Sequence, residues 1–397
     1  MKKWNLGRAS TLALVAVFLL VACGPSDPEP EREPYSSNQT FSAADTAAMV
    51  IPEPFDGLEI VDPGWVTEVQ YRDDVYLAAI ERGGVLEYTA VDVEGTVLWA
   101  VERPASCTGF VVTADEVGRP IAVLSDLQTT DKSLTAATAS GYDLMTGEHV
   151  WGPVDVPGVY QGPGVIFADP PQGGMGETGP RVALDPTSGT VAASEMSEEG
   201  IRVLGEYSGI VLITENEQLI ARNAGDKTEL WSVALSERDW KAEDVRAALD
   251  PIAGDRFVKV IISNSASAII DLQNGEIDAN AREAALDSAT QTLVLRNGEG
   301  LHAYSAADQE LWSISAPDET RIAAIGAGHL YVEENEIVHE HDLDTGDVVR
   351  SYDADEHQTL VVPTNIGKDG AAILFDGDRH LLAIAPKADA ADESEQS

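Results

Sequence analysis

Short apolar runs alternate with turns rich in Gly, Asp and Asn along most of the chain, from about residue 51 to residue 386. Eight segments share one pattern: an apolar residue, Asp, two variable residues, Thr, Asn or Ser, then Gly, three variable residues and Trp, with drift. They span 90–101, 141–153, 183–194, 221–233, 269–280, 303–314, 340–351 and 374–385. Seven intervals separate Asp92 from Asp376, so the mean period is about 41 residues. Such a period predicts an all-β propeller of four-stranded antiparallel blades. We expect eight blades, or seven if one degenerate segment is an insertion.

The recurring residue types explain how each blade would form. Asp at the start of a turn accepts hydrogen bonds from the backbone two residues later, and Gly adopts a positive φ at low cost. A large Trp ring fills the wedge between blades, because no blade buries its faces alone. We expect these roles for Asp92, Gly95, Trp99, Asp143, Gly147, Trp151, Asp185, Gly189, Trp231, Asp271, Gly275, Trp312, Asp342 and Gly346. A strand within 57–72 is expected to close the ring beside the last blade.

Three of the segments carry a family resemblance. ALDPTSG (183–189), YDLMTGEHVW (142–151) and HDLDTGDVV (341–349) resemble the repeats of PQQ-like β-propellers, over roughly residues 65–386. Dehydrogenases of that family hold pyrroloquinoline quinone with Ca²⁺ in the central funnel, and many place a Cys-Cys disulfide beside it. This chain has only two cysteines and no adjacent pair. We therefore expect a propeller without a catalytic site, cofactor or metal.

The N-terminal residues predict where the protein operates. The start of the chain contains three basic residues, Lys2, Lys3 and Arg8. An apolar stretch follows that is too short for a lasting transmembrane helix, and it ends in Leu20-Val21-Ala22-Cys23. This arrangement resembles a bacterial lipoprotein signal peptide. The resemblance implies that residues 1–22 are removed and that Cys23 is lipidated. The protein would then be extracytoplasmic and anchored to the bacterial cell membrane; the alternative is an ordinary secretory signal that contains a cysteine.

Composition divides the rest of the chain. Residues 23–50 are rich in Pro, Glu, Asp and Ser, which predicts a disordered acidic spacer before a propeller over 51–386 and a disordered acidic tail over 387–397. The formal net charge is −43, or −46 once the three bases of residues 1–22 are removed. Such a charge repels nucleic acid, so we expect no nucleic-acid partner.

Few residues suggest chemistry of their own. Cys107 has no intramolecular partner if Cys23 carries lipid, and it is most simply a small buried residue. His339 and His341 flank Glu340, and alternation along a strand would place both imidazoles on one face, at a spacing that suits a metal. No third or fourth ligand is identifiable by motif, so a polar strand face is the preferred interpretation.

The longest intervals between turns indicate a binding face. They contain residues 125–141 and 236–251, and a Gly-rich stretch lies at 168–181. In repeat proteins such excess chain is usually found in loops on one face, which often bind a partner. We therefore expect a scaffold that binds a protein or cell-envelope component through loops 125–141 and 236–251. The alternatives are a small-ligand sensor and, less favoured, a PQQ- and Ca²⁺-dependent dehydrogenase.

Overall fold

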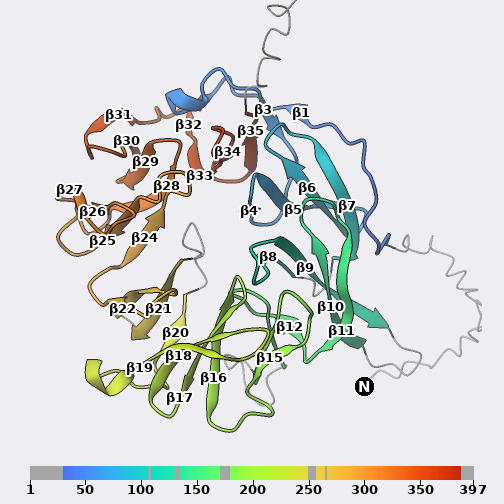
Figure 1. Ribbon diagram of the computed structural model, residues 1–397. Helices are drawn as coiled ribbons and strands as arrows, with labels where there is room; N and C mark the ends of the chain where they lie inside the picture. Colours follow the sequence, from blue (N-terminus) through green and yellow to red (C-terminus); the bar gives the residue numbers. More distant parts are fainter. Residues whose placement is uncertain are drawn as a thin grey trace, which may run out of the picture.

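The computed structural model describes residues 30–105, 109–129, 135–169, 179–248, 256–263 and 266–385. In these ranges the chain forms eight four-stranded antiparallel blades that follow one another around a ring, and one further strand joins the edge of the last blade; this confirms the predicted eight-bladed all-β propeller (Figure 1). Blade 1 consists of β4 (Gln70–Arg72), β5 (Val75–Arg82), β6 (Val85–Asp92) and β7 (Val97–Pro104), and blade 2 of β8 (Phe110–Ala114), β9 (Pro120–Thr129), β10 (Thr135–Asp143) and β11 (His149–Val156). Blade 3 consists of β12 (Val159–Tyr160), β13 (Ile166–Ala168), β14 (Arg181–Leu184) and β15 (Val191–Ser194), and blade 4 of β16 (Ile201–Tyr207), β17 (Ile210–Glu215), β18 (Gln218–Asn223) and β19 (Glu229–Ala234).

Blades 5 to 7 continue the ring, and blade 8 is completed from the N-terminal side. Blade 5 consists of β20 (Arg246–Ala247), β21 (Phe257–Ser263), β22 (Ala266–Asp271) and β23 (Ile277–Asp278), and blade 6 of β24 (Glu283–Leu286), β25 (Leu293–Arg296), β26 (Leu301–Tyr304) and β27 (Glu310–Ile314). Blade 7 consists of β28 (Arg321–Gly326), β29 (His329–Glu334), β30 (Ile337–Asp342) and β31 (Val348–Tyr352), and blade 8 of β33 (Val362–Ile366), β34 (Ala372–Phe375), β35 (His380–Ala383) and β3 (Ile60–Asp62).

Strand direction gives the ring two different faces. The first strand of a blade lies towards the centre of the ring and the fourth at the rim, as β4 and β7 show in Figure 1. Because neighbouring strands are antiparallel, the turns between first and second strands and between third and fourth strands lie on one face, which we call the turn face. The connections between second and third strands, and between one blade and the next, lie on the opposite face, which we call the loop face.

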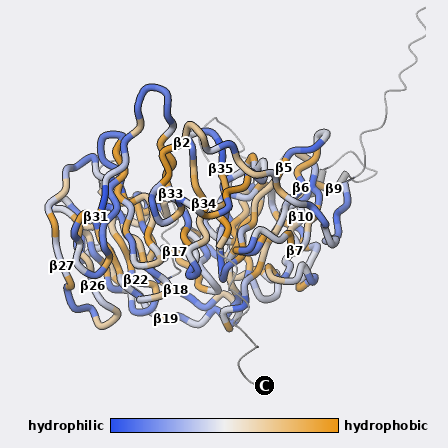
Figure 2. Tube along the Cα trace, turned by 90° about the horizontal axis from the view of Figure 1, so that it is seen from above, coloured by the Kyte–Doolittle hydropathy of each residue, from blue (hydrophilic) through white to orange (hydrophobic). Residues whose placement is uncertain are grey.

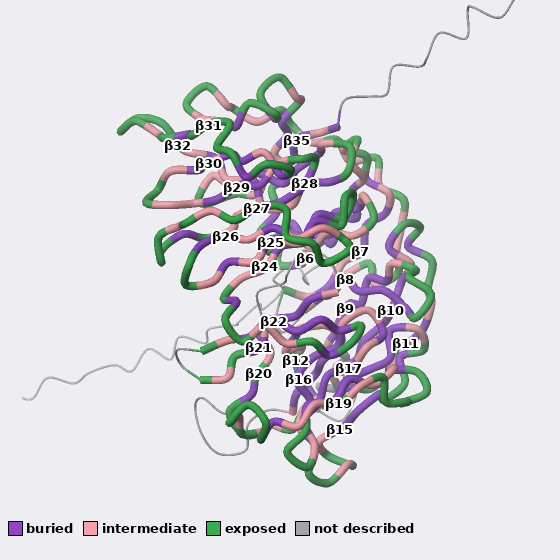
Figure 3. Tube along the Cα trace, turned by 60° about the vertical axis from the view of Figure 1, so that its left-hand side comes forward, coloured by how far each residue is buried: buried purple, intermediate pink, exposed green. Residues whose placement is uncertain are grey.

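The hydrophobic core is divided among the seams between blades. Each of the eight buried clusters joins two neighbouring blades; Val75 and Tyr88 of blade 1, for example, pack with Ala122 and Leu124 of blade 2. Figure 2 shows the hydrophobic positions along the strands and hydrophilic turns at both faces, and Figure 3 shows burial following the same division. A fully buried large apolar side chain contributes about 1.5–3 kcal/mol. Stacking of blades therefore supplies stability that no single blade has.

Ring closure uses a strand from the N-terminal side. Ile60 and Val61 of β3 pair with Ala383 and Leu382 of β35, so the last blade takes its fourth strand from far earlier in the chain. The strand expected within 57–72 is thus residues 60–62, whereas residues 70–72 already belong to blade 1.

The eighth repeat has a different register from the one read in the sequence. Asp376 lies between β34 and β35, the second and third strands of its blade, whereas the other seven turns join third and fourth strands. The two kinds of turn look alike, because Asp376 Oδ1 also accepts hydrogen bonds from the backbone of Asp378 and Arg379. The propeller still has eight blades, since β3 replaces the missing fourth strand.

Residues 30–50 differ from the predicted disordered spacer. Tyr35 forms a two-way backbone bridge with Ala100 at the outer edge of β7. Further along, β1 (Ser42–Ala43) pairs with β3, and β2 (Met49–Val50) pairs in parallel with β32 (Thr359–Leu360). The short 3-10 helix η1 (Glu53–Phe55) then buries Phe55 against Tyr331. We call residues 30–58 the N-terminal strap. The strap is polar in composition, yet it still docks. The edge strands of the blades offer it unpaired backbone groups, and the seams between blades offer apolar sites, so a few residues of the strap are enough to hold it.

Candidate binding face and ring centre

The predicted Trp residues connect one blade to the next through the same contact, repeated four times. The indole Nε1–H of Trp99 donates to the carbonyl of Leu144, the residue after Asp143 in the neighbouring blade, at 2.8 Å. The other three do the same: Trp151 to Pro186, Trp231 to Leu272 and Trp312 to Leu343, at 2.7–2.8 Å. The Trp of one repeat therefore belongs with the Asp-Gly turn of the following repeat. This role is structural, because each contact joins two neighbouring blades.

The predicted Gly residues lie beneath these rings. Gly147 has φ +70, and a Cβ there would stand 2.7 Å from Trp99 Cγ. Gly189, Gly275 and Gly346 lie in the same way under Trp151, Trp231 and Trp312. At Gly95 the neighbour is Ile384. The turn Asp residues accept backbone hydrogen bonds as expected from their type; Asp92 Oδ1, for instance, accepts from Glu94 and Thr96 at 3.0 and 2.8 Å. The corresponding side chains of Asp143, Asp185, Asp271 and Asp342 each accept a backbone N–H two residues on.

The segment 125–141 is a β-hairpin, where the sequence predicted a loop. β9 and β10 pair from Ile121↔Asp143 to Thr129↔Thr135, and they are the longest strands in the described ranges. The connection itself, residues 130–134, lies outside the described residues.

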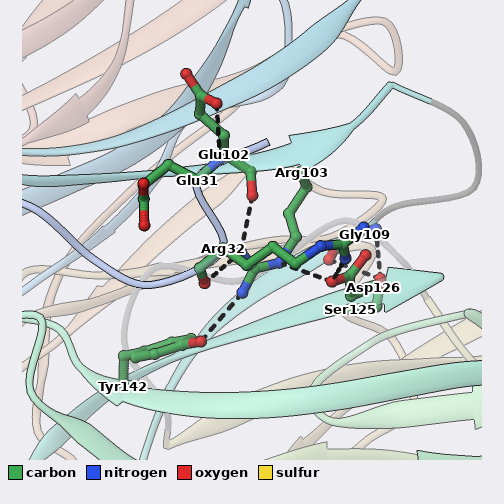
Figure 4. A network of polar contacts seen from close by, with 8 residues as sticks. All are labelled: Glu31, Arg32, Glu102, Arg103, Gly109, Ser125, Asp126 and Tyr142. Carbon is green, nitrogen blue, oxygen red and sulfur yellow. Dashed lines mark hydrogen bonds and ion pairs between the residues drawn. The ribbon is translucent and has the colours of Figure 1, made fainter. Parts of the chain in front are cut away.

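A buried charge network joins this hairpin to the N-terminal strap (Figure 4). Arg32 of the strap pairs with Asp126 of β9, whose side chain is 11% exposed. Arg103 of β7 is almost fully buried; it donates to the Arg32 carbonyl at 2.9 Å and to the Tyr142 hydroxyl at 3.1 Å. Glu31 extends the contact by accepting the Glu102 backbone N–H on its carbonyl at 2.8 Å. The strap is thus fixed to blades 1 and 2 by charge-assisted contacts as well as by backbone pairing.

The segment 236–251 is described as far as Ala248 and connects blade 4 to blade 5 on the loop face. It begins in a short 3-10 helix, η2 (Leu235–Arg238), and the predicted helical composition yields only this one turn. Arg238 lies over the ring of Trp240, at 5.9 Å from its centroid. Arg202 of β16 donates to the Ala242 carbonyl at 2.6 Å. The segment is therefore held close to the blade below it, with its charged side chains exposed. The Gly-rich stretch 168–181 is described only at its ends.

A buried carboxyl lies where the inner strands of blades 2, 3 and 4 meet. Glu206, at the end of β16, is 1% exposed. Its carboxylate accepts the Gly209 N–H at 2.7 Å, the Val165 N–H at 3.1 Å and the Thr113 hydroxyl at 3.2 Å. Arg72 of blade 1 reaches the same place, donating to Ser208 Oγ at 3.0 Å. Side chains of blades 1, 2 and 4 and a backbone N–H of blade 3 thus meet at the ring centre on the turn face.

The electrostatics of this centre are set by burial. Desolvation raises the pKa of Glu206 to about 7, against the two backbone N–H donors, Thr113 and the Arg72 charge, all of which lower it. Burial also lowers the pKa of Arg72 and raises the pKa of Tyr160 and Tyr207 beside the carboxyl. No local sequence pattern marked Glu206 or Arg72, because their neighbours come from distant repeats.

The two predicted strand histidines make separate contacts. Their rings lie on one face of β30 at 6.5 Å between centroids, as alternation predicts. His341 is buried, which lowers its pKa, and its Nδ1–H donates to the Gly346 carbonyl at 2.9 Å; His339 Nδ1 contacts Ser351 Oγ. Glu340 points to the opposite face, where it accepts the Tyr352 hydroxyl. Among the described residues, no group of three or more His, Cys, Asp or Glu side chains is arranged to hold a metal ion.

Several sequence predictions fall outside the described residues, namely the signal peptide over 1–22, lipidation at Cys23, the spacer as far as residue 29, the burial of Cys107 and the acidic tail over 387–397. Within the ranges described, no helix is long and apolar enough to cross a bilayer.

Comparison with known proteins gives distant structural similarity only. No protein-family model matches the chain, and no curated protein matches its sequence. Similar solved structures include the computationally designed Ika8 protein, with 14% identity, a TM-score of 0.37, and coverage of 83% of this chain and 84% of that one. A chain of the Mitotic Checkpoint Complex has 11% identity, a TM-score of 0.38, and coverage of 88% and 99%. Kluyveromyces lactis Hsv2p has 14% identity, a TM-score of 0.33, and coverage of 67% and 70%.

Proposed function

We propose that this protein is a lipid-anchored extracytoplasmic scaffold whose propeller binds a protein or cell-envelope component through its loop face, without catalysing a reaction. The observation that carries the proposal is the unequal length of the connections. Third-to-fourth-strand turns are uniformly short, as between Asp143 and His149. On the loop face, the long β9–β10 hairpin, the 168–181 connection and the segment between Ala234 and Arg246 add extra chain. Rigid scaffolds that carry long loops on one face commonly bind there.

The N-terminal residues support the anchored location. The Leu20-Val21-Ala22-Cys23 sequence after a basic start is the pattern on which lipid attachment depends. Two or three acyl chains hold a protein stably on a bilayer, because a single chain binds only reversibly. The strap is docked from Glu31 onward, so the first contact with the propeller comes only eight residues after the proposed anchor.

A non-catalytic role agrees with the residues at the ring centre. The buried carboxyl of Glu206 is satisfied by backbone and hydroxyl donors, and Arg72 donates to Ser208 beside it. The sequence also lacks the adjacent cysteines that many quinoprotein dehydrogenases of the resembling family use.

Crosslinking in intact cells tests the proposal. The lipidated protein would be crosslinked, purified by affinity tag and compared with a Cys23→Ala variant, which is expected to leave the membrane fraction and lose envelope partners. A double charge reversal of Arg238→Glu and Lys241→Glu alters exposed side chains of the loop face and should reduce recovery of a specific partner.

The matched control is Val117→Ser, which changes an 82% exposed side chain on the turn face and should leave recovery unchanged. A partner lost equally in the control and the loop-face variant, or no reproducible partner at all, would count against binding through the loop face. Membrane retention of Cys23→Ala would count separately against the anchor.

A further inference from the structure

Among the described residues, the seam between blades 5 and 6 has the smallest buried cluster. This cluster contains Phe257, Ile269, Ala281 and Leu286, whereas each of the other seven contains at least nine described residues. The sequence explains part of this difference. Blade 5 has Ala279 four residues after its turn glycine, where blades 1, 2, 4 and 6 have the Trp that bonds to the next blade.

A cleft opens above this small core. Its volume is about 970 Å³. One wall of the cleft is formed by β21 of blade 5, where residues 259, 261 and 263 lie on the same face of the strand. The opposite wall belongs to blade 6 and is formed by the residues just before β24 and by the turn between β25 and β26. The lining includes Lys259, Ile261, Ser267, Arg282, Arg296 and Asn297. A space of this size accommodates a small molecule, since ligand sites are typically about 300–1,000 Å³.

The charge of the lining is opposite to that of the protein. The whole chain has 68 acidic and 25 Lys or Arg residues. The cleft is lined by three basic residues, Lys259, Arg282 and Arg296, and by one acidic residue, Glu299. Charges elsewhere on the surface are screened over about 8 Å at physiological salt, so the local cations decide which ligand is favoured inside the cleft.

The three cations differ in how far the protein already neutralises them. Arg296 is 7% exposed; its Nη2 donates to Glu283 at 3.2 Å, but its buried Nε has no hydrogen-bond partner in the described part of the chain. Arg282 pairs with Asp318, and both side chains are exposed, so water weakens this pair. The ammonium of Lys259 has neither a hydrogen bond nor an ion pair to the residues described. The charge of Lys259 on the blade 5 wall therefore remains uncompensated among the described residues, and on the blade 6 wall Arg282 is held only by an exposed, water-weakened pair.

We propose that this cleft binds a small polyanion that carries at least two carboxylate or phosphate groups, one facing Lys259 and one facing Arg282. Lysine provides a compact charge and arginine a planar fork, and both groups suit these anions. The amide of Asn297 is available as a further donor, because its Oδ1 already accepts from Glu299 and Gly300. A nucleic acid does not fit, because beyond the cleft it would meet the acidic surface.

Titration calorimetry on the chain without residues 1–22 tests the site, with citrate and inorganic phosphate as separate probes at constant ionic strength. We expect saturable binding of at least one probe; citrate alone identifies carboxylates as the preferred groups, and phosphate alone identifies phosphates. Lys259→Gln should weaken binding at least tenfold, and Lys259→Glu should abolish it. The control Lys368→Ala removes an exposed lysine of the β33–β34 turn and should bind as the unmodified protein does.

Thermal unfolding of each variant identifies any loss of fold, and Lys259→Gln keeps most of the side-chain stem in case charge reversal disturbs the seam. The proposal is overturned if neither probe binds saturably, or if a folded Lys259→Gln protein binds as tightly as the Lys368→Ala control. This test is independent of the anchor and of the loop-face partner.

Discussion

At the scale of single residues, Glu206 shows how burial outweighs local hydrogen bonding. Three donors favour its carboxylate form, yet removal from water raises its pKa to about 7. The unfolded chain would release the same proton near 4.5. Between these values the folded protein binds a proton that the unfolded chain does not. The contribution to stability is therefore full below pH 4.5 and is lost as the pH rises through 7.

The first prediction concerns this pH dependence. Unfolding free energy measured by urea denaturation should fall by about 3 kcal/mol between pH 4.5 and 8 because of Glu206 alone. Glu206→Gln should remove this component. It should also lower stability near pH 5, because the amide presents a donor to a backbone N–H. Glu319→Gln changes an exposed acid and should keep the slope; an unchanged slope in Glu206→Gln would refute the assignment.

The second prediction separates backbone strain from packing at a Trp contact. Gly147 and Gly118 both have positive φ, but a Cβ meets Trp99 only at Gly147 and finds open space at Gly118. Gly118→Ala should cost about 1 kcal/mol from φ alone, and Gly147→Ala about 3 kcal/mol, because Trp99 is buried and has no room to move. Chemical denaturation followed by Trp fluorescence measures both, and equal losses would show that the ring adapts.

At the scale of elements, the seams differ although the blades repeat. Four seams carry a Trp bonded to the next blade, and the seam between blades 7 and 8 is covered by the strap through Phe55. In the part of the chain that the structure describes, the seam between blades 5 and 6 has neither, and its buried cluster is the smallest. Local opening follows the amount of buried apolar contact, so this seam should open first.

The third prediction follows from that difference. Backbone amides of β21 and β22 should exchange with solvent at least about tenfold faster than those of β9 and β10, which corresponds to about 1.4 kcal/mol in opening free energy. Hydrogen exchange with mass spectrometry compares equivalent strands of the two blades in one experiment. Equal protection would mean that the ring opens as a single cooperative unit.

At the scale of the whole molecule, the strap sets the distance between the propeller and the proposed anchor. Cys23 and Glu31 are eight residues apart, and a fully extended chain of that length reaches no more than about 29 Å. A free spacer through residue 50, as composition suggested, would have allowed a much greater distance. If Cys23 is the anchor, as we propose, we expect the docked strap to place the rim of blade 1 nearest the bilayer.

The fourth prediction tests this orientation. In a Cys107→Ser background, a donor dye attached at Glu33→Cys should transfer energy to a membrane acceptor more efficiently than a dye at Leu311→Cys on the rim of blade 6. Leu311 is 43% exposed, so labelling does not disturb the core. Equal transfer would show that the strap leaves the propeller when the protein is anchored, and no transfer from either position would show that the anchor itself is absent.

The sequence by itself determined the β class, the repeat and the blade number. The alternation of apolar and polar residues and the Asp-Gly turns are local properties, and they recur from repeat to repeat. It also predicted the wedge position of Trp99 and its counterparts, although not which carbonyl each indole contacts. The sequence also predicted that a strand within 57–72 closes the ring, and the tertiary structure decided that this strand is residues 60–62. Only the tertiary structure decided that the strap docks on β7 and that residues 125–141 form a hairpin. It alone brought Glu206 beside Arg72 and Lys259 opposite Arg282. These pairs join residues from different blades, and no local pattern records which distant strands will become neighbours when the ring closes.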